Sequence, residues 1–354
     1  FTQTTPLSVQ RNANKLFWLS SFFVSRVIGQ VHLLGWETWE KSLNSAPLPD
    51  QVPLLRPPEN REMLGLWVGL LQRNLLRKIQ EFRKKPHWSI ALLKGKLEGK
   101  EVLVQPDILE VWEHPDSDNY YWADPFPVFF GGKEYVFAEE FDKKSQKGQL
   151  VCLERNEGKI EVHLVVKESW HLSYPFVWQE GEEVYLIPES AEAGKVFLYR
   201  SLDFPTRWER VSVLLDGEAY DPTVIKWDGL YWLFVNQKAH PECSPFDELF
   251  LYFSEDLQHA SWQAHPQNPI VSDVRNSRPA GNIFFHEGKL CRPAQDSGLR
   301  YGHRIHIQEI ETLTRQKYRE KTIQTLESFP GFVSGIHTFN QGKNGVWIDT
   351  FRRK

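Results

Sequence analysis

The sequence predicts an all-β fold for most of the chain: a five-bladed β-propeller over residues 87–354, preceded by a small helical segment over residues 1–86. Three observations support this fold class. A hairpin-like motif recurs five times, aromatic residues are abundant, and helical spacing of apolar residues is confined to the first 85 residues. The 14 Trp, 23 Phe and 11 Tyr favour sheets, because flat rings pack well on pleated surfaces.

The first helix is expected within residues 12–42, where apolar side chains such as Leu16 and Leu19 recur at helical spacing. Charged residues, among them Lys15 and Arg26, interrupt the stretch. We therefore expect a buried core helix and not a membrane span.

A proline-rich connection and a second helix follow. Five prolines between residues 47 and 58 predict an extended linker, because proline does not continue a helix. Residues 62–85 predict an amphipathic helix with a basic end. One interpretation is a packed helix with a charged solvated side; the other is peripheral contact with an anionic membrane or with a second subunit. The basic residues are Arg73, Arg77, Lys78, Arg83, Lys84 and Lys85.

The repeat decides the architecture of the rest. Each unit has a polar residue, usually followed by proline, then alternating apolar residues, a Gly-centred turn and an apolar strand, which together predict a β-hairpin. The units recur at intervals of roughly 50 residues, the size of a four-stranded propeller blade. A strand within residues 88–112 is expected to join the last blade and close the ring. The units begin at Asp124, Tyr174, Asp221, Arg278 and, in the most degenerate unit, Ser334.

Charge and cysteine content exclude several classes of protein. A net charge of −4 offers no global field for nucleic acid, so no nucleic-acid partner is expected. Cys152, Cys243 and Cys291 are too few and too scattered for a disulfide framework or a zinc site, which favours a reducing, cytoplasmic location. We assign no metal and no cofactor. The sequence begins at Phe1 without a signal peptide, so we expect a further domain upstream.

The candidate site is the central channel of the propeller. Inner strands surround this channel, so the first residues of the repeats converge at one end although they are distant in sequence. Carboxylates placed close together shift each other's pKa, and one can then act as an acid while another acts as a base or nucleophile. The first strands contribute Asp124, Tyr174, Asp221, Arg278 and His337, and the second strands contribute Glu139 or Glu140, Glu189, Asn236, Arg292 with Asp296, and Asp349.

Four carboxylates are the candidate catalytic residues: Asp124, Asp221, Glu189 and Glu140. One Asp-Pro pair alone is typical of a turn. Two such pairs at matching repeat positions, both expected at the channel mouth, favour a functional site.

Several of the candidate substrate-binding residues have two possible interpretations. The arginines either form ion pairs inside the propeller, with Asp296 or Glu189 as partners, or bind an anionic group of the substrate. The histidine either donates to a sugar hydroxyl or carries a proton. The tryptophan either stacks on a sugar ring or packs between blades. These candidates are Trp122, Tyr174, Arg278, Arg292, Asp296 and His337.

The repeat pattern resembles the five-bladed propellers of family 43 glycoside hydrolases. A closer resemblance, over roughly residues 105–350, is to the N-terminal propeller domain of plant glucosamine inositolphosphorylceramide transferases and related bacterial proteins. It rests on six short motifs in order: Trp122-Ala-Asp-Pro-Phe126, Ser173-Tyr-Pro-Phe176, Ile187-Pro-Glu-Ser190, Arg278-Pro-Ala-Gly281, Arg292-Pro-Ala-Gln-Asp296 and Tyr301-Gly302.

The resemblance implies roles for some of these residues. In the family 43 hydrolases the general base maps onto Asp124, and the aspartate that tunes the acid maps onto Asp221. The general acid is a glutamate that opens blade four, where this sequence has Arg278. Glu140, Glu189 or Asp296 would have to replace it, so simple inverting hydrolysis does not follow. In the plant transferases the transfer chemistry is ascribed to a separate domain, and in some bacterial relatives a formyltransferase-like domain precedes the propeller.

Two functional hypotheses remain. In the first, the propeller is an enzyme that cleaves or transfers a glycosyl unit of a glycoside or glycoconjugate, with Asp124 and Asp221 in the chemistry. In the second, it is a glycan-recognition module whose carboxylates only accept hydrogen bonds from sugar hydroxyls. We favour the enzyme, because polar groups gathered this densely are costly unless function requires them.

Overall fold

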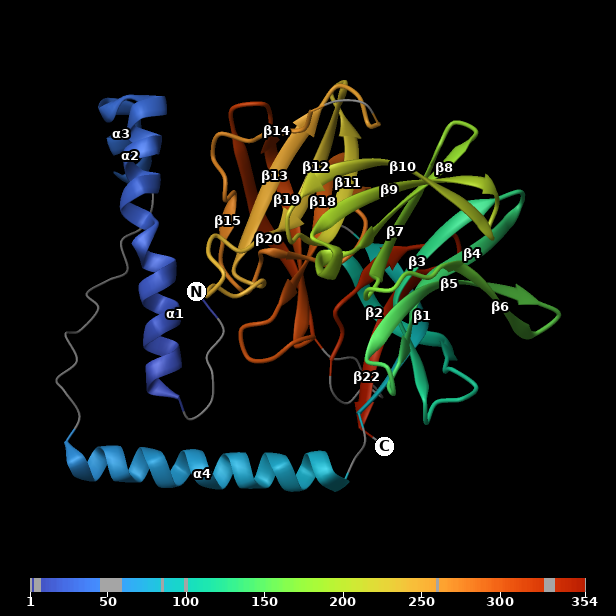
Figure 1. Ribbon diagram of the computed structural model, residues 1–354, viewed down its shortest axis with the longest axis horizontal. Helices are drawn as coiled ribbons and strands as arrows, with labels where there is room; N and C mark the ends of the chain where they lie inside the picture. Colours follow the sequence, from blue (N-terminus) through green and yellow to red (C-terminus); the bar gives the residue numbers. More distant parts are fainter. Residues whose placement is uncertain are drawn as a thin grey trace. The chain divides into compact units, whose positions relative to one another are not determined.

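The computed structural model describes residues 2, 8–44, 59–83, 86–98, 101–258, 261–327 and 335–353. The chain divides into two compact units, one made of strands and one made mainly of helices (Figure 1). The strand unit comprises Pro86–Lys238 and Ser244–Lys354 with Phe1–Gln3, and the helical unit comprises Thr4–Lys85 with Ala239–Cys243.

The strand unit is a five-bladed β-propeller, as predicted, and each blade is an antiparallel sheet. Blade 1 contains β3 (Tyr120–Phe130), β4 (Lys133–Asp142), β5 (Lys147–Asn156) and β6 (Lys159–Val166). Blade 2 contains β7 (Ser173–Glu180), β8 (Glu183–Glu189), β9 (Lys195–Asp203) and β10 (Arg207–Asp216), with a short 3-10 helix, Ala191–Ala193, after β8.

The next two blades are more irregular at their edges. Blade 3 contains β11 (Tyr220–Trp227), β12 (Leu230–Asn236), β13 (Glu248–Ser254), β14 (Gln263–Ala264) and β15 (Val271–Ser272). Blade 4 contains β16 (Arg278–Pro279), β17 (Phe284–His286), β18 (Lys289–Asp296), β19 (Arg304–Leu313) and β20 (Tyr318–Leu326). In blade 4 both β16 and β17 pair with β18, so two short strands take the inner position.

Blade 5 closes the ring by joining the two ends of the strand unit. It contains β21 (Phe339–Gln341), β22 (Val346–Arg353), β1 (Pro86–Glu98) and β2 (Glu101–Trp112). The register of β1 on β22 runs from Pro86↔Arg353 to Leu93↔Val346. The closing strand predicted within residues 88–112 is confirmed, but the segment folds back on itself and supplies two strands.

The Gly-centred turns of the repeat connect the inner hairpins. In blade 3, Asp228 and Gly229 both have left-handed backbones, with φ of 49° and 75°, and lie between the paired residues Trp227 and Leu230. This is the two-residue type I′ turn, whose twist matches that of the flanking strands.

Apolar side chains fill the space within and between the blades. Trp122, Trp232 and Trp347 are among the largest fully buried side chains, so these rings serve packing. The three cysteines are free and buried, with no disulfide between them.

The first predicted helix of the helical unit is divided into shorter helices. In place of one helix over residues 12–42 there are three: α1 (Val9–Ser21), α2 (Phe23–Leu34) and α3 (Trp36–Asn44). Gly35 separates the last two with a φ of 75°, a conformation that ends a helix readily in glycine. The second predicted helix is α4 (Asn60–Arg83).

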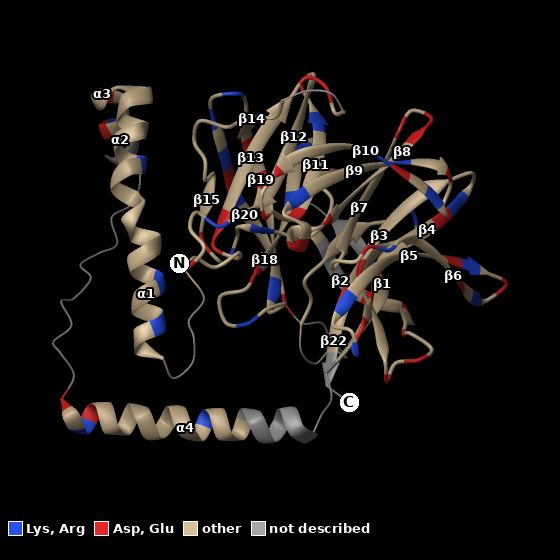
Figure 2. Ribbon diagram, viewed as in Figure 1, with Lys and Arg blue, Asp and Glu red and all other residues tan. Residues whose placement is uncertain are grey.

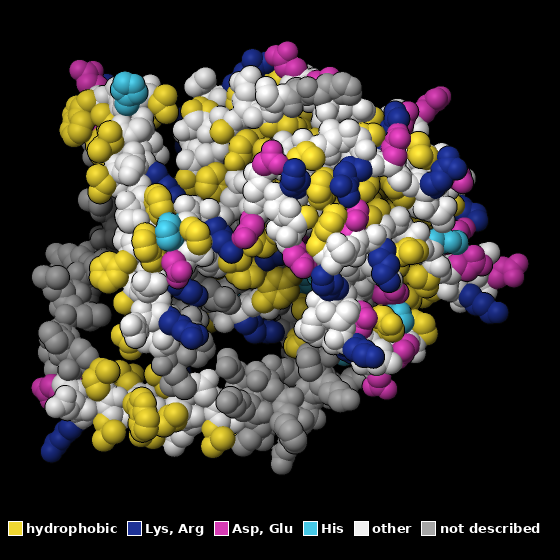
Figure 3. Space-filling model, viewed as in Figure 1, with side chains coloured by type: hydrophobic (Ala, Val, Ile, Leu, Met, Phe, Trp, Pro, Cys, Tyr) yellow, Lys and Arg dark blue, Asp and Glu magenta, His cyan; other side chains and the backbone are white. Residues whose placement is uncertain are grey.

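The prediction of a buried core helix is wrong for the described residues of α1 and α2, where only Leu19 is buried. Helical spacing identifies the helix, but it does not say what covers its apolar side. Phe17 is 74% exposed, and Figure 3 shows apolar side chains on the surface of these helices. Taken together, α1 and α2 span Val9–Leu34, 26 residues with the length and composition of a membrane-crossing helix.

The interpretation of α4 as a packed helix with a charged solvated side is also wrong for its described part. Its large apolar side chains from Met63 to Leu76 are exposed. Residues 16–25 and 63–72 contain no charged residue at all (Figure 2). The proline-rich linker, the side chains of Arg77, Lys78 and Arg83, and residues Lys84 and Lys85 lie outside the described residues.

Candidate functional site

The inner strands of blades 1, 2 and 3 are bulged at equivalent positions. Asp124, Tyr174 and Asp221 have left-handed backbones, with φ of 50°, 44° and 49°. At each of them the register to the second strand is interrupted. A left-handed backbone costs about 1–2 kcal/mol in a residue with a Cβ atom. Because the same strained bulge recurs in three blades, the Asp-Pro and Tyr-Pro motifs encode this bulge and not an ordinary turn.

The first charged group at the channel mouth joins blades 1 and 5. The His337 imidazole lies between two carboxylates: Nε2 is 3.1 Å from Asp124 Oδ1, and Nδ1 is 2.7 Å from Asp349 Oδ2. The backbone N–H of Tyr174 donates to Asp124 Oδ2 at 3.1 Å. All three charged side chains are at most 5% exposed.

These surroundings determine the charge of His337. Burial by itself would lower the pKa of the imidazole, but the nearby carboxylates of Asp349 and Asp124 outweigh it and raise the pKa to about 10. His337 is therefore an imidazolium at neutral pH. The ligand atoms of Asp124, His337 and Asp349 lie within 4.8 Å of one another, which is also metal-ligand spacing. With the imidazole protonated, His337 and the two carboxylates form an ion triad.

The second charged group joins blades 2, 3 and 4. The Arg278 guanidinium donates to both carboxylate oxygens of Asp221, with Nη2 3.0 Å from Oδ1 and Nε bonded to Oδ2. The same Nη2 donates to Glu189 Oε2 at 3.3 Å. Gln295 Nε2 donates to Asp221 Oδ2 at 3.0 Å. Asp221 is thus held by a bidentate arginine and an amide at once.

Two glutamates beside these groups favour the protonated form. Burial, and then the nearby charge of Asp221, hold the pKa of Glu189 well above its usual range. Burial, and then Asp124, do the same for the pKa of Glu139. A neutral carboxylic acid can donate a hydrogen bond or a proton, so the mouth combines paired charges with neutral acids.

Aromatic side chains frame the two groups. The Tyr301 ring centroid is 4.8 Å from that of His337, and the Arg278 guanidinium lies 5.5 Å from the Tyr301 ring. Tyr301 is 39% exposed, so one ring touches both charged groups and still reaches solvent. On the inner side, the Tyr174 hydroxyl bonds to Thr223 Oγ1 at 2.9 Å and accepts from the Gly281 N–H at 2.8 Å. Tyr174 therefore links the inner edges of blades 2, 3 and 4.

The structure brings together six of the predicted residues: Asp124, Tyr174, Asp221, Arg278 and His337 from the inner edges of the blades, and Glu189 from a second strand. For Arg278 the ion-pair alternative holds: it pairs with Asp221 and also donates to Glu189.

Trp122 and Glu140 are placed elsewhere. Trp122 is 1% exposed inside an apolar cluster, so it packs in the core and does not stack on a ligand. Its indole N–H donates to Glu140 Oε2 at 3.2 Å, and Gln149 and His114 also bond to Glu140. Successive residues of a strand face opposite sides, so Glu139 and not Glu140 lies with the mouth residues.

Arg292 and Asp296 are likewise bound within blade 4. Arg292 pairs with Glu320 at 2.7 Å and is 1% exposed. Asp296 accepts from Arg304 Nε at 2.7 Å and from the Gly298 N–H at 2.9 Å. Arg292 thus forms a structural ion pair, but its partner is Glu320 and not the predicted Asp296 or Glu189.

Sequence reasoning left Glu139, Gln295, Tyr301 and Asp349 out of the assigned site. Glu139 and Asp349 were in the wider second-strand set, and strand alternation alone could not choose Glu139 over Glu140. Gln295 and Tyr301 stand in the motifs that carry the family resemblance. Their position in these motifs was the sequence signal that could have assigned Gln295 and Tyr301 to the site.

The sequence was compared with known families and proteins. The sequence profile of the family described as "Glucosamine inositolphosphorylceramide transferase 1, N-terminal" matches residues 111–334. The chain belongs to this family. This confirms the predicted resemblance.

The curated relatives that match this chain are much longer than it is. The glucosamine inositolphosphorylceramide transferase 1 of Arabidopsis thaliana is 32% identical over 203 residues, covering 56% of this chain and 26% of the relative. The protein of that name from Oryza sativa subsp. japonica is 31% identical over 227 residues, covering 63% of this chain and 29% of the relative. The chain therefore spans little more than a quarter of these relatives.

Solved structures with a similar fold are glycoside hydrolases. A GH62 α-L-arabinofuranosidase catalytic domain from Coprinopsis cinerea matches with a TM-score of 0.49 at 14% identity, covering 75% of this chain and 96% of that one. A GH43_1 enzyme from Xanthomonas citri matches with a TM-score of 0.48 at 11% identity, covering 66% and 87%. These likenesses concern the fold alone.

Proposed function

We propose that the propeller binds the sugar or polyol part of a glycoconjugate at the channel mouth and holds it without cleaving it. One observation carries this proposal: the two aspartates that resemble hydrolase residues are each neutralised by a cation of the same chain. His337 pairs with Asp124, and Arg278 pairs with Asp221.

Hydrolysis needs a different arrangement. It requires two carboxyl groups across the sugar, about 5–10 Å apart, one free to act as a base or nucleophile and the other as an acid. Here Asp124 Oδ1 lies against an imidazolium, and its Oδ2 accepts a backbone N–H. Both oxygens of Asp221 are bonded to Arg278. These contacts favour a structural or ligand-holding role for both carboxylates over attack on a sugar.

The mouth suits a hydroxyl-rich ligand. Carboxylates accept hydrogen bonds from hydroxyls, and the raised pKa values of Glu139 and Glu189 favour neutral acids, which can donate to hydroxyl oxygens. The half-exposed Tyr301 ring provides an apolar face for the C–H side of a sugar. The relatives are named as transferases of glucosamine inositolphosphorylceramide, and this supports a sugar or inositol headgroup as the ligand class.

A second candidate function is acid–base catalysis of glycosyl transfer. The raised pKa of Glu189 favours it, because a buried, protonated carboxyl beside Asp221 can serve as a general acid. In this case Glu189 would protonate a leaving oxygen, and Asp221 with Arg278 would position it.

The test combines binding and turnover. Wild type, Glu189→Gln, Asp124→Asn and Tyr301→Ala would be incubated with methyl glycosides of neutral, amino and acidic sugars, myo-inositol and nucleotide sugars. Our proposal expects saturable binding without product, weakened in Tyr301→Ala and retained in Glu189→Gln. Sugar release or transfer by wild type that disappears in Glu189→Gln while binding persists would establish the catalytic alternative. Binding that is unchanged in all three variants would place the ligand elsewhere.

A further inference from the structure

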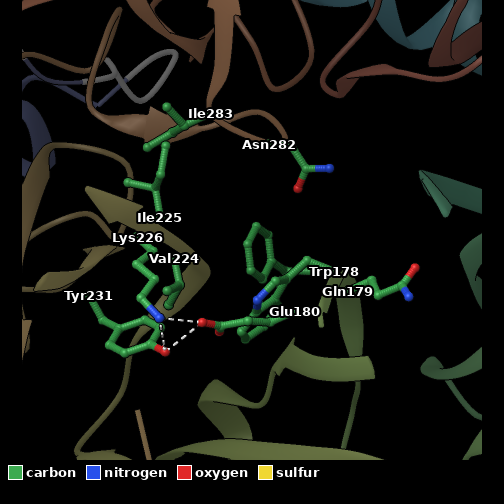
Figure 4. A pocket seen from close by; sticks show the side chains of 10 residues that line it. Trp178, Gln179, Glu180, Val224, Ile225, Lys226, Tyr231, Asn282 and Ile283 are labelled. Carbon is green, nitrogen blue, oxygen red and sulfur yellow. Dashed lines mark hydrogen bonds and ion pairs between the residues drawn. The ribbon is translucent and has the colours of Figure 1, made fainter. Parts of the chain in front are cut away.

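A second cavity lies between the inner strands of blades 2, 3 and 4. Its volume is about 330 Å³, at the lower end of the range for ligand pockets. Phe176 and Val224 contribute apolar side chains, and Trp178 and Asn282 face the same space (Figure 4).

This cavity is separate from the channel mouth. On β7 the mouth residue is Tyr174, and the cavity residue Trp178 follows four residues later, about 13 Å further along an extended strand. On β11 the mouth residue Asp221 likewise precedes Val224. The Tyr174 phenol is bonded to Thr223 and Gly281. It lies between the mouth residues and the cavity residues of β7 and β11.

A polar network borders one side of the cavity. The Lys226 ammonium donates to Glu180 Oε1 and, at 2.9 Å, to the Tyr231 hydroxyl. The Tyr231 hydroxyl donates to the same Glu180 oxygen at 2.8 Å (Figure 4). Lys226, Glu180 and Tyr231 are hydrogen-bonded to one another, so the charges of Lys226 and Glu180 are paired. The network forms a polar edge of the cavity beside the Phe176 and Trp178 rings.

Two polar atoms at the cavity have no hydrogen-bond partner among the described residues. Asn282 Oδ1 is buried and unpaired, and it is an acceptor. The Trp178 indole N–H is a donor, and none of the hydrogen bonds within the described chain involves it. Trp178 is only partly buried, so its N–H is open to solvent or to a ligand. A buried polar atom without a partner costs about 1–3 kcal/mol, so a ligand that donates to Asn282 Oδ1 gains affinity.

The buried acceptor of Asn282 and the accessible donor of Trp178 together select the ligand chemistry. An anion can accept from Trp178 but cannot donate to Asn282. An ammonium group can donate to Asn282 but cannot accept from Trp178. A hydroxyl does both, and the Phe176 and Trp178 rings suit the C–H face of a sugar. We propose that this cavity is a second binding site, for one neutral sugar or polyol ring, independent of the channel mouth.

Ligand-observed NMR on the whole chain tests the site. The probes are methyl glucoside, methyl galactoside, methyl N-acetylglucosaminide and myo-inositol, with methyl glucuronide as the charged comparison. Trp178→Phe keeps a ring but removes the N–H, and Asn282→Ala removes the acceptor. Trp227→Phe is the matched control, because Trp227 is a half-exposed indole of β11 that does not line the cavity. Tyr301→Ala disables the mouth only.

We expect saturable binding of at least one neutral probe, weakened roughly tenfold in both cavity variants and unchanged in Trp227→Phe and Tyr301→Ala. Loss of binding in Tyr301→Ala with no change in the cavity variants would assign the signal to the mouth and overturn this proposal alone. Absence of binding by every neutral probe, or binding of the glucuronide alone, would also overturn it. Circular dichroism and thermal unfolding of each variant show whether it folds like wild type.

Discussion

His337 provides a quantitative test of the ion triad. Its imidazolium is 3% exposed and contacts the carboxylates of Asp124 and Asp349, so replacing it leaves two buried carboxylates without a cation. We predict that His337→Gln strongly destabilises the propeller at neutral pH. The effect should depend on pH, since its cause is a proton on the imidazole.

The magnitude follows from the pKa. A rise from 6.5 to about 10 in the folded state corresponds to stabilisation on the order of 5 kcal/mol at 1.36 kcal/mol per pH unit. This is similar to the roughly 3–5 kcal/mol lost when one partner of a buried ion pair is removed. Because the pKa is higher in the folded state, the stabilisation is fully present below pH 6.5 and is lost as the pH rises through about 10.

The assay is urea unfolding of wild type and His337→Gln at several pH values between 6 and 10. The difference in unfolding free energy should be largest near pH 6 and shrink towards pH 10. His265→Gln is the matched control. His265 is 2% exposed, bonds to the Thr314 carbonyl at 3.0 Å, and has a pKa that burial lowers. Above about pH 8 the unfolded imidazole is neutral as well as the folded one, so over pH 8–10 its variant should differ from wild type by a constant of about 1 kcal/mol.

A constant difference for His337→Gln over the same range would refute the reasoning, because it would mean that the imidazole carries no extra proton in the folded state. Direct observation by NMR gives an independent check. Two ring N–H signals should persist at pH 8, and titration of His337 near 6.5 would contradict the triad.

Three further predictions concern stability and surface binding. Arg278→Met should lower the unfolding free energy by about 3–5 kcal/mol in urea titrations, and adding Asp221→Asn should restore part of the loss, since fewer buried charges are then left unpaired. Gly281→Ala should cost clearly more than about 1 kcal/mol in thermal unfolding, because its Cβ would lie 2.2 Å from the Phe339 oxygen; Gly288→Ala, with no atom within 4 Å, is the milder control. From the exposed apolar side chains of α4 we expect co-sedimentation with phosphatidylserine vesicles, reduced by Trp67→Asp. If light scattering instead shows dimers that Trp67→Asp dissociates, a second subunit covers this helix.

The sequence was sufficient to predict the fold of the strand unit because the signal is repeated. Each blade alone carries a weak pattern, but five copies at similar spacing define the architecture. The same repetition predicted that Asp124, Asp221, Arg278 and His337 meet, since equivalent positions converge in a ring. The closing strand near residue 88 was predicted from the need to remove sheet edges.

The second strands were harder to predict for a physical reason. The side-chain period of a strand is two, so an error of one residue moves a side chain to the opposite face. Choosing Glu140 instead of Glu139, and Asp296 instead of Gln295, are errors of this kind. The bulge at each inner strand adds an unpaired residue, so the face of a second-strand residue cannot be counted from its partner.

The carboxylates of the mouth also have a structural role, because they lie close to backbone N–H groups of the neighbouring blade. The Asp124 N–H lies 3.4 Å from Asp349 Oδ2, and the Asp221 N–H lies 3.4 Å from Glu189 Oε2. In both cases the acceptor is on the second strand of one blade and the donor is the bulge residue of the next blade. The carboxylates therefore join neighbouring blades and maintain the strained bulges.

A dense cluster of acids in a propeller channel is thus explained in part without catalysis. Loss of activity in an aspartate variant would therefore not by itself identify a catalytic residue. Half-exposed Tyr301, which lies outside this framework, discriminates better between binding and catalysis.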